Sequence, residues 1–261
     1  MIDATPTTTE PKSRRRWYQY SLRTLLIFVT LAGCGFGWLG IKVREARQQQ
    51  ADVAAIAKVG YVQYDYQFDS QGNEMPDAKP PGPAWLHELL GDDFFCRVYR
   101  VVINLPYASD ADRDHVDGLT MLTDADLEHL AGFTRLKQLF LDGTHVTDAE
   151  LNHLEGLTQL EVLRLSDTQV TDAGLEHLKV LPQLEWLRLD GTQVTDAGLE
   201  NIQGMIELRG LWLVGTNVTD AGLEHLKRLT QLDWLYLGRT HVTASGVAKL
   251  KTALPNCLIS R

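Results

Sequence analysis

The hydrophobic positions between residues 133 and 252 recur with a fixed period of 24 residues. Each copy opens with apolar residues at alternate positions, such as Leu163 and Leu165, and this spacing predicts a short strand with one buried face. The second half of the copy changes to apolar residues three apart, such as Leu175 and Leu178, which lie on one side of a helix. We therefore expect one strand and one helix in every copy.

Five full copies share this pattern. They cover residues 133–156, 157–180, 181–204, 205–228 and 229–252, and the helix of one more copy is visible at Leu122–Leu130. One copy cannot bury its own leucines, so the copies must stack into a solenoid with a continuous core. Val170, between strand and helix, is also expected to turn inward. Stacking places the strands in a parallel sheet, with about 4.8 Å between neighbours.

The pattern LxxLxLxxTxVTDxGLxxLxx resembles leucine-rich repeats of the VTDxGL type, close to the class found in F-box substrate adaptors and some bacterial proteins. The tail ALPNCLI (253–259) is similar to the closing strand of such arrays. The front half, with SLRTLLIFVTLAG and a charged helix, resembles membrane-anchored repeat proteins of planctomycete-type bacteria. The resemblance implies an α/β solenoid with helices on the convex side. No F-box-like helical module is visible, so an adaptor role is not inferred.

Polar residues also recur at the repeat period. The repeats carry a threonine column at Thr144, Thr168, Thr192, Thr216 and Thr240, an aspartate column at Asp124, Asp148, Asp172, Asp196 and Asp220, and a histidine column at His129, His153, His177 and His225. Threonine hydroxyls can bond to the backbone of a turn. We interpret each aspartate as a helix N-cap in preference to a metal-binding stripe. A structural role in the repeat is also favoured for the histidines over metal binding, since no suitably spaced ligand accompanies them.

Charge is divided unevenly along the 261 residues. Residues 1–50 hold eight Lys or Arg and three Asp or Glu, whereas residues 51–261 hold 17 basic and 31 acidic residues. An acidic body argues against nucleic acid as a partner, because nucleic-acid binding calls for a basic patch. The three cysteines, Cys34, Cys96 and Cys257, are too sparse for a disulfide scaffold.

The N-terminal part predicts a membrane anchor. A basic tail (1–23) precedes the uncharged run Leu25–Ile41, which predicts a single transmembrane helix over 24–42. A juxtamembrane helix (43–60) and an N-terminal cap with a Pro-rich linker (61–105) would then lead to the repeat domain (106–261). Within the cap, alternating apolar residues predict a strand over 62–68.

The anchor has two rivals and an expected orientation. A cleaved signal peptide lacks a small-residue cleavage site after the apolar run. The run Leu31-Ala32-Gly33-Cys34 matches a bacterial lipobox, which would make Cys34 a lipidated N-terminus, but the apolar run continues past it. Basic residues are more numerous before the span than after it. The positive-inside rule therefore predicts a cytoplasmic N-terminus with the repeats outside, on the periplasmic side.

Between the core leucines, each strand carries residues that face solvent on the sheet side. Two adjacent columns read Gln138, Val162, Trp186, Gly210, Trp234 and Phe140, Arg164, Arg188, Trp212, Tyr236. Trp, Tyr and Arg dominate binding hot spots. We therefore predict a partner-binding patch, with Gly210 leaving a dip that seats a partner's side chain. The predicted patch consists of Trp186, Arg188, Trp212, Trp234 and Tyr236, extended by Phe140 and Arg164.

These features favour a membrane-anchored, protein-binding module over an enzyme. The sequence shows no nucleophile turn, phosphate loop or metal-ligand spacing, and it calls for no cofactor, metal or catalytic residue. A protein or peptide partner fits the sheet face. The alternative is a structural envelope component without a dedicated ligand, which would not need a clustered aromatic surface.

Overall fold

The computed structural model describes residues 22–75, 77–103 and 124–261. Most of the predicted basic tail and the predicted start of the repeat domain at residue 106 lie outside these ranges. The chain forms two compact units, Met1–Lys42 and Val43–Arg261.

Helix α1 runs without interruption over Leu22–Ile56. In the described part of the chain, no helix is both long enough and apolar enough to cross a membrane. The transmembrane helix predicted for Leu25–Ile41 therefore finds no support there. The last turns of α1 belong to the second unit, where Asp52 and Ile56 are buried.

The second unit is built on an eight-stranded sheet in which the strands follow one another in chain order. Strands β1 and β2 are antiparallel, and every later neighbour is parallel. The strands are β1 (Gly60–Tyr64), β2 (Val98–Ile103), β3 (Gln138–Phe140), β4 (Val162–Arg164), β5 (Trp186–Arg188), β6 (Gly210–Trp212), β7 (Trp234–Tyr236) and β8 (Leu258–Ser260). From β3 to β8 each residue pairs with the residue 24 positions later, so the sequence period is the register of the sheet.

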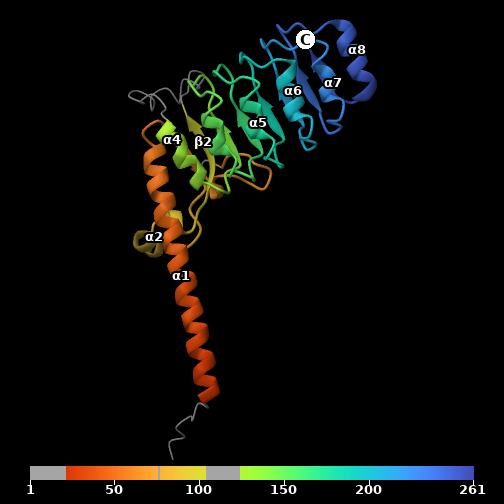
Figure 1. Cartoon of the computed structure of the whole chain (residues 1–261). Coiled ribbons are helices and arrows are strands. Elements are labelled where there is room, and N and C mark those ends of the chain that lie inside the picture. Colours follow the sequence, from red (N-terminus) through yellow and green to blue (C-terminus); the bar gives the residue numbers. More distant parts are fainter. Residues whose placement is uncertain (1–21, 76, 104–123) are drawn as a thin grey trace, which may run out of the picture. The chain divides into compact units, whose positions relative to one another are not determined.

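Short helices cover one face of this sheet (Figure 1). The helical segments are η1 (Asp65–Gln67), α2 (Ala84–Leu90), η2 (Asp92–Phe94), α4 (Asp124–Glu128), η3 (His129–Gly132), η4 (Glu150–Leu154), α5 (Gly174–Leu178), α6 (Asp196–Ile202), α7 (Leu223–Leu226) and α8 (Ala244–Ala253). The molecule is a leucine-rich-repeat solenoid of the α/β class, as the repeats predicted. In the first full copy the expected helix is a 3-10 segment, η4, of the same length as α5 in the next copy.

The core is a continuous column of leucines between sheet and helices. The strand residues Leu163, Leu187 and Leu211 are fully buried, and so are Leu175 and Leu199 from the helices. Val170 is also fully buried, which confirms that this position turns inward. Each leucine contacts neighbours from adjacent repeats, so the burial of one repeat depends on the next.

The N-terminal end of the core is closed by the pair β1 and β2. Strand β2 joins β3 in parallel, so Val98–Ile103 supplies the divergent first strand of the array. The strand predicted for 62–68 is wrong beyond Tyr64, where the chain turns into η1. The Gln67 side chain causes this turn by accepting a hydrogen bond from the Tyr64 backbone amide at 2.8 Å.

The threonine column bonds to the backbone as expected. Each hydroxyl donates to the carbonyl three residues earlier, at 2.6–2.7 Å, and the side chains of the first four are buried. In four of the five turns the same carbonyl also accepts from the threonine's own amide, at 3.2–3.3 Å, so the hydroxyl adds a second bond that holds the turn after each strand.

Asp148, Asp172, Asp196 and Asp220 bond to the next repeat and do not cap their own helices, which corrects the sequence interpretation; the side chain of Asp124 lies outside the described part of the chain. The carboxylate of Asp196 reaches the next repeat and accepts hydrogen bonds from the Thr219 amide at 2.7 Å and the Thr219 hydroxyl at 2.6 Å. Thr219 Oγ1 then accepts from the Ala221 amide at 3.2 Å. Threonine is the N-cap of α6 and α8, at Thr195 and Thr243, and before α7 it bonds within the turn that leads into the helix. In each case the aspartate of the preceding repeat holds that threonine. Asp148, Asp172 and Asp220 make the same pair of bonds, to Thr171, Thr195 and Thr243.

We call this arrangement the aspartate–threonine clasp, and it explains the glycine of VTDxGL. A Cβ atom on Gly222 would lie 2.3 Å from Asp196 Oδ1, and Gly174, Gly198 and Gly246 face the same conflict with Asp148, Asp172 and Asp220. In the first full copy the glycine is replaced by Glu150. Its carboxylate accepts hydrogen bonds from both the amide and the hydroxyl of Thr147.

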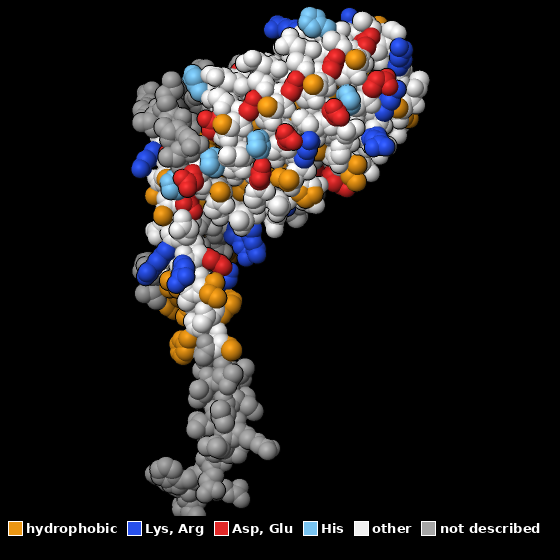
Figure 2. Space-filling model, viewed as in Figure 1, with side chains coloured by type: hydrophobic (Ala, Val, Ile, Leu, Met, Phe, Trp, Pro, Cys, Tyr) orange, Lys and Arg blue, Asp and Glu red, His pale blue; other side chains and the backbone are white. Residues whose placement is uncertain are grey.

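His129 and His177 of the histidine column pair with acidic side chains. His129 Nδ1 lies 2.9 Å from Asp52 Oδ1 on α1, and His177 Nδ1 lies 2.8 Å from Glu155 Oε1 of the preceding repeat. Figure 2 shows histidines and acidic side chains recurring along the repeats on the face that it displays. One pair joins a repeat to α1 and the other joins two consecutive repeats, in keeping with a structural role for this column.

Because the repeats stack on one another, a cavity at the centre of the array should lower the free energy of unfolding substantially. Leu187→Ala should lower the free energy of unfolding by about 2–5 kcal/mol, because it removes a fully buried side chain between repeats. Urea denaturation followed by circular dichroism measures the change. Val180→Ala, at a position 49% exposed in the preceding repeat, is the control and should change stability by less than about 0.5 kcal/mol.

The clasp predicts a coupling between two positions. Asp196→Ala should cost about 1–3 kcal/mol of unfolding free energy through two lost hydrogen bonds. Gly222→Ala should cost a similar amount in the native background, because its Cβ meets the carboxylate. In the Asp196→Ala background the same substitution should cost clearly less, because the Gly222 backbone is already helical and only Leu199 Cδ1, 3.0 Å from the added Cβ, remains in close contact. Additive effects in a double-mutant cycle would contradict the clasp.

Candidate functional site

The outward-facing side chains of the sheet form two columns in register. Trp186, Gly210 and Trp234 are successive neighbours in one column, and Arg188 and Trp212 are neighbours in the other. All seven residues of the predicted patch lie on β3 to β7 and are half-buried. They are Phe140, Arg164, Trp186, Arg188, Trp212, Trp234 and Tyr236.

The aromatic rings of this face pack against one another. The rings of Trp212 and Tyr236 are nearly parallel, with an interplanar angle of 9° and a centroid distance of 5.2 Å. Trp186 lies 5.8 Å from Trp212 and 5.3 Å from Trp234, centroid to centroid. Because strands in a sheet are about 4.8 Å apart, rings on adjacent strands meet at stacking distance. The four rings form one rigid cluster, which we call the aromatic cluster.

Gly210 does not leave the dip that the sequence suggested. Trp186 and Trp234 lie two strands apart, yet their rings stack across the glycine between them. A Cβ atom on Gly210 would lie 2.5 Å from Trp186 and 2.7 Å from Trp212. The space above Gly210 is therefore filled by indole rings, and glycine is needed to let them approach.

Two arginines extend the second column. The guanidinium of Arg188 lies 5.4 Å from the Trp212 ring centroid, and that of Arg164 lies 4.9 Å from the Phe140 ring centroid. Such cation–π contacts hold the guanidinium over the ring face. Arg164 and Arg188 are direct neighbours in the column, with no aromatic ring between them.

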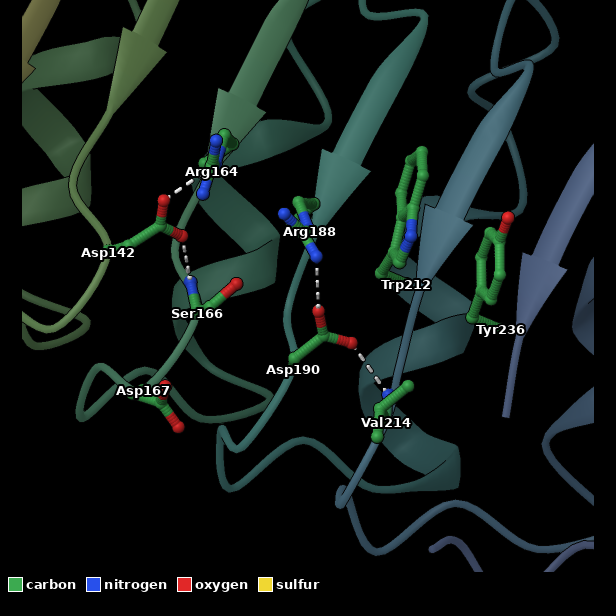
Figure 3. A pocket seen from close by; sticks show the side chains of 9 residues that line it. All are labelled: Asp142, Arg164, Ser166, Asp167, Arg188, Asp190, Trp212, Val214 and Tyr236. Carbon is green, nitrogen blue, oxygen red and sulfur yellow. Dashed lines mark hydrogen bonds and ion pairs between the residues drawn. The ribbon is translucent and has the colours of Figure 1, made fainter. Parts of the chain in front are cut away.

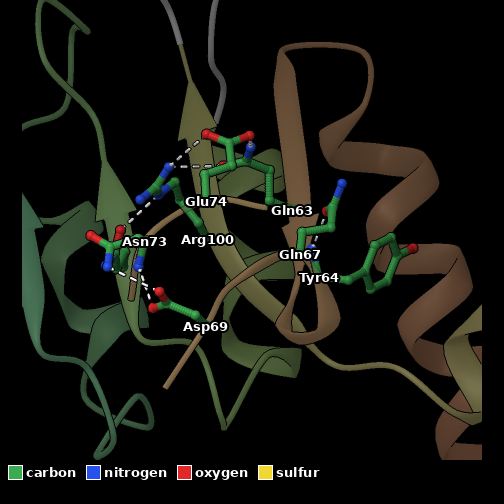
Figure 4. Close-up of polar contacts among 8 residues, drawn as sticks. Gln63, Tyr64, Gln67, Asp69, Asn73, Glu74 and Arg100 are labelled. Carbon is green, nitrogen blue, oxygen red and sulfur yellow. Dashed lines mark hydrogen bonds and ion pairs between the residues drawn. The ribbon is translucent and has the colours of Figure 1, made fainter. Parts of the chain in front are cut away.

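The N-terminal end of the second column is covered by the cap. Arg100 on β2 lies 5.4 Å from the Phe140 centroid and 4.6 Å from that of Phe68. It also donates a hydrogen bond to Gln138 at 2.6 Å. A second one goes to Gln63 at 3.0 Å (Figure 4). Phe140 is thus held between Arg100 and Arg164, which makes it part of the junction with the cap. Phe140 is half-buried like the rest of the predicted patch, but its ring is flanked by two guanidinium groups.

A shallow depression of about 570 Å³ lies beside the second column, open to solvent. It is lined by Asp142, Arg164, Ser166, Asp167, Arg188, Asp190, Trp212, Val214 and Tyr236 (Figure 3). The arginines and rings come from the strands, and the remaining residues come from the turns that follow them. Its size is in the range of small-ligand sites, although its walls are shallow.

The acidic residues of the depression pair with its arginines. Asp142 Oδ2 lies 2.6 Å from Arg164 Nε, and Asp142 Oδ1 accepts from the Ser166 amide at 2.9 Å. Asp190 Oδ2 lies 3.4 Å from an Arg188 Nη atom, and its Oδ1 accepts from the Val214 amide at 2.8 Å. Burial raises the pKa of Asp190, although the Val214 amide and Arg188 act in the opposite direction.

These turn residues were missed by sequence reasoning. The signal is the third position after each central strand leucine, which reads Asp142, Ser166, Asp190, Val214 and Gly238 in successive copies. This column varies where the core does not. The backbone at this position is the same in every copy, but the residue type changes from copy to copy. The fold therefore does not require a particular side chain here.

The described residues contain no cluster of three or more potential metal ligands. The carboxylates of the depression are already engaged by arginines and backbone amides. What the face offers chemically is a rigid apolar cluster beside guanidinium and carboxylate groups, an arrangement suited to recognition.

No protein-family model matches the chain, and no curated protein is significantly similar in sequence. Among solved structures, it is similar to an internalin (inlF) of Listeria monocytogenes, with 25% identity and a TM-score of 0.45 over 51% of this chain and 36% of that one. Internalin C2 of the same organism is 27% identical, with a TM-score of 0.43 over 51% of this chain and 54% of that one. A leucine-rich-repeat protein of Leptospira interrogans is 21% identical, with a TM-score of 0.43 over 51% of this chain and 33% of that one. The matched part thus spans between a third and about half of each neighbour's length.

Proposed function

We propose that this chain is an interaction protein whose sheet face binds a protein or peptide partner. The observation that carries the proposal is the aromatic cluster of Trp186, Trp212, Trp234 and Tyr236, held half-exposed on the outward face of β5 to β7. Tryptophan, tyrosine and arginine are the residue types enriched in binding hot spots.

Rigidity adds to the binding potential of this face. Each ring is fixed by contact with another ring, and Arg188 is fixed between Trp212 and Asp190. A partner that binds here does not have to immobilise free side chains, which ordinarily costs about 0.5–1.5 kcal/mol for each one. Since the rings stack face to face, the partner meets mainly their edges and the adjacent guanidinium groups.

A binding role explains this surface better than the alternative of a purely structural envelope component. A structural solenoid needs its core and its clasps, and neither requires three tryptophans on the outward face. Catalysis is not proposed, because the charged groups of the depression are engaged with one another and with backbone amides.

The sheet-face proposal predicts position-specific crosslinking. A benzoylphenylalanine photocrosslinker placed at Tyr236 in the full chain should capture a discrete partner in cells, whereas the same group at Ile206 should not. Ile206 is 59% exposed and lies outside the strands. Trp212→Ala should reduce the capture at position 236 by roughly tenfold or more, the effect of losing about 2 kcal/mol of binding energy.

Two controls accompany this comparison. Ile206→Ala removes exposed apolar area from the same repeat and should leave capture at position 236 unchanged. Trp212→Ala also removes contacts with Trp186 and Tyr236, so it should destabilise folding by about 1–3 kcal/mol. Capture is therefore measured well below the melting temperature. Normal capture by a folded Trp212→Ala variant would contradict the proposal and favour the structural alternative.

For the N-terminal unit we propose attachment to a membrane, with the repeats on the periplasmic side. The support is the uncharged run Leu25–Ile41 together with the exposed apolar side chains Phe36, Trp38 and Ile41 of α1. Apolar side chains on a helix surface favour lipid over water. A lipid on Cys34 is the alternative mode of attachment.

Thiol labelling of the detergent-solubilised chain distinguishes these modes. Cys34 is exposed, while Cys257 is buried, and burial raises the pKa of the Cys257 thiol to about 11. Its thiolate is scarce at pH 8, so a water-soluble maleimide should label Cys34 of detergent-solubilised native chain and spare Cys257 until denaturation. A lipidated Cys34 would resist labelling in both states. Extraction of the chain by high salt without detergent would contradict membrane attachment through apolar contact.

A further inference from the structure

Arg164 and Arg188 form an unusual pair on the sheet face. They are direct cross-strand neighbours on β4 and β5, in register and pointing out of the same face. Like charges at directly opposed positions destabilise a sheet. Each arginine has an aromatic neighbour on its other side, Phe140 for Arg164 and Trp212 for Arg188, but between them two guanidinium side chains follow one another.

The two guanidiniums turn away from each other. Arg164 reaches Asp142, which belongs to the preceding repeat, whereas Arg188 reaches Asp190 in its own repeat and the Trp212 ring beyond it. Both arginines line the open depression together with Ser166, and the space between the two side chains is part of that depression (Figure 3). We call this space, bounded by Arg164, Arg188 and Ser166, the arginine notch.

Ser166 marks a missing carboxylate. It occupies the column position that aspartate fills at Asp142 in the preceding copy and at Asp190 in the following one. Arg188 pairs with the acid of its own repeat, but Arg164 finds serine there and pairs backwards with Asp142. Ser166 is only 7% exposed, and its hydroxyl has no hydrogen-bond partner. A buried hydroxyl without a partner costs free energy that a bound acceptor would recover.

The notch has hydrogen-bond donors to spare and few uncommitted acceptors. Both oxygens of Asp142 and of Asp190 already accept bonds or pair with arginine. Each guanidinium carries five N–H donors, and Arg188 Nε is buried without a partner. The remaining acid of the depression, Asp167, places its carboxylate against Gly191, and Figure 3 shows it directed away from both arginines.

We propose that the arginine notch binds a carboxylate of the partner, which takes the place of the acid absent at Ser166. The inference rests on the proposed function of the sheet face and names the chemistry of the contact. A planar carboxylate matches the fork of a guanidinium, and two guanidiniums on adjacent strands can share one such group. The Ser166 hydroxyl donates to the same group from below. The neighbouring edges of Trp212 and Tyr236 contact the apolar part of the residue that carries it.

An aspartate or glutamate side chain and a chain-terminal carboxylate are two sources of this group. The experiment uses the full chain in detergent, labelled with 5-fluorotryptophan, and follows the fluorine resonance of Trp212, assigned with a Trp212→Phe variant. Trp212 reports on the notch because it contacts Arg188. The probes are acetyl-glutamate amide, acetyl-alanine with a free carboxylate, and acetyl-glutamine amide. Glutamine is the neutral isostere of glutamate.

A saturable shift of the Trp212 resonance is expected with acetyl-glutamate amide, at an affinity about fivefold or more above that for acetyl-glutamine amide. A stronger response to acetyl-alanine would assign the site to a chain terminus, and a stronger response to glutamate would assign it to a side chain. Equal shifts with the glutamate and glutamine probes would overturn the proposal, and so would the absence of any shift.

Ser166→Asp provides the decisive variant. It supplies the missing carboxylate from within the chain, so it should fill the notch, keep or raise the melting temperature, and weaken carboxylate binding by about tenfold or more. Val214→Asp is the matched control, because it adds the same charge at the same repeat position two copies later. This control should retain most of the binding. If Ser166→Asp folds and binds acetyl-glutamate amide normally, the carboxylate does not lie in the notch.

The two proposals fail separately. If Trp212→Ala abolishes capture of the partner while Ser166→Asp leaves the glutamate probe bound, the sheet face is the binding surface but the notch is not its carboxylate site. If Trp212→Ala leaves capture unchanged, the sheet-face function itself is wrong, whatever the probe does.

Discussion

The burial of each repeat's leucines depends on the repeat beside it. A strand of three residues and a helix of four to ten cannot form a core alone, and the structure supplies the missing wall from both neighbours. The aspartate–threonine clasp adds polar bonds that fix how each repeat is aligned with the next. Because a carboxylate of one repeat must meet the amide and hydroxyl of the next, sliding by one residue would leave these groups unpaired as well as expose the leucines.

The same constraint determines what the outward face can be. Registered strands about 4.8 Å apart bring side chains at equivalent positions within reach of one another. Where those side chains are aromatic they stack, as in Trp212 and Tyr236, and where one is an arginine it lies over the neighbouring ring. The ring faces are covered by neighbouring rings of the cluster, so a partner can contact mainly the ring edges. These edges carry the positive end of the aromatic quadrupole. The cap limits this surface at Phe140 through Arg100.

Periodicity made the core predictable, since a leucine at a fixed position in every copy has only one stable place in a stacked array. Partners of polar groups were harder to predict. An aspartate after threonine has the same spacing whether it caps its own helix or reaches a threonine 23 residues later, and Asp196 does the second. The rings above Gly210 were misjudged because strand spacing says nothing about the direction in which an indole leans. At Ser166 the sequence shows the change of residue, but the unpartnered hydroxyl appears only when Arg164 is seen to turn towards Asp142.

The clasp also bears on how such an array changes length. It joins equivalent positions of consecutive copies, so an in-frame duplication or loss of 24 residues recreates the same junction, with the same aspartate facing the same threonine and glycine. The outward columns take no part in that junction. A gene for this scaffold can therefore gain, lose or exchange copies without repair of the interior, and each new copy brings its own outward residues next to the existing ones. The binding surface can therefore change whenever copies recombine, while the fold is still held by the same interface between repeats.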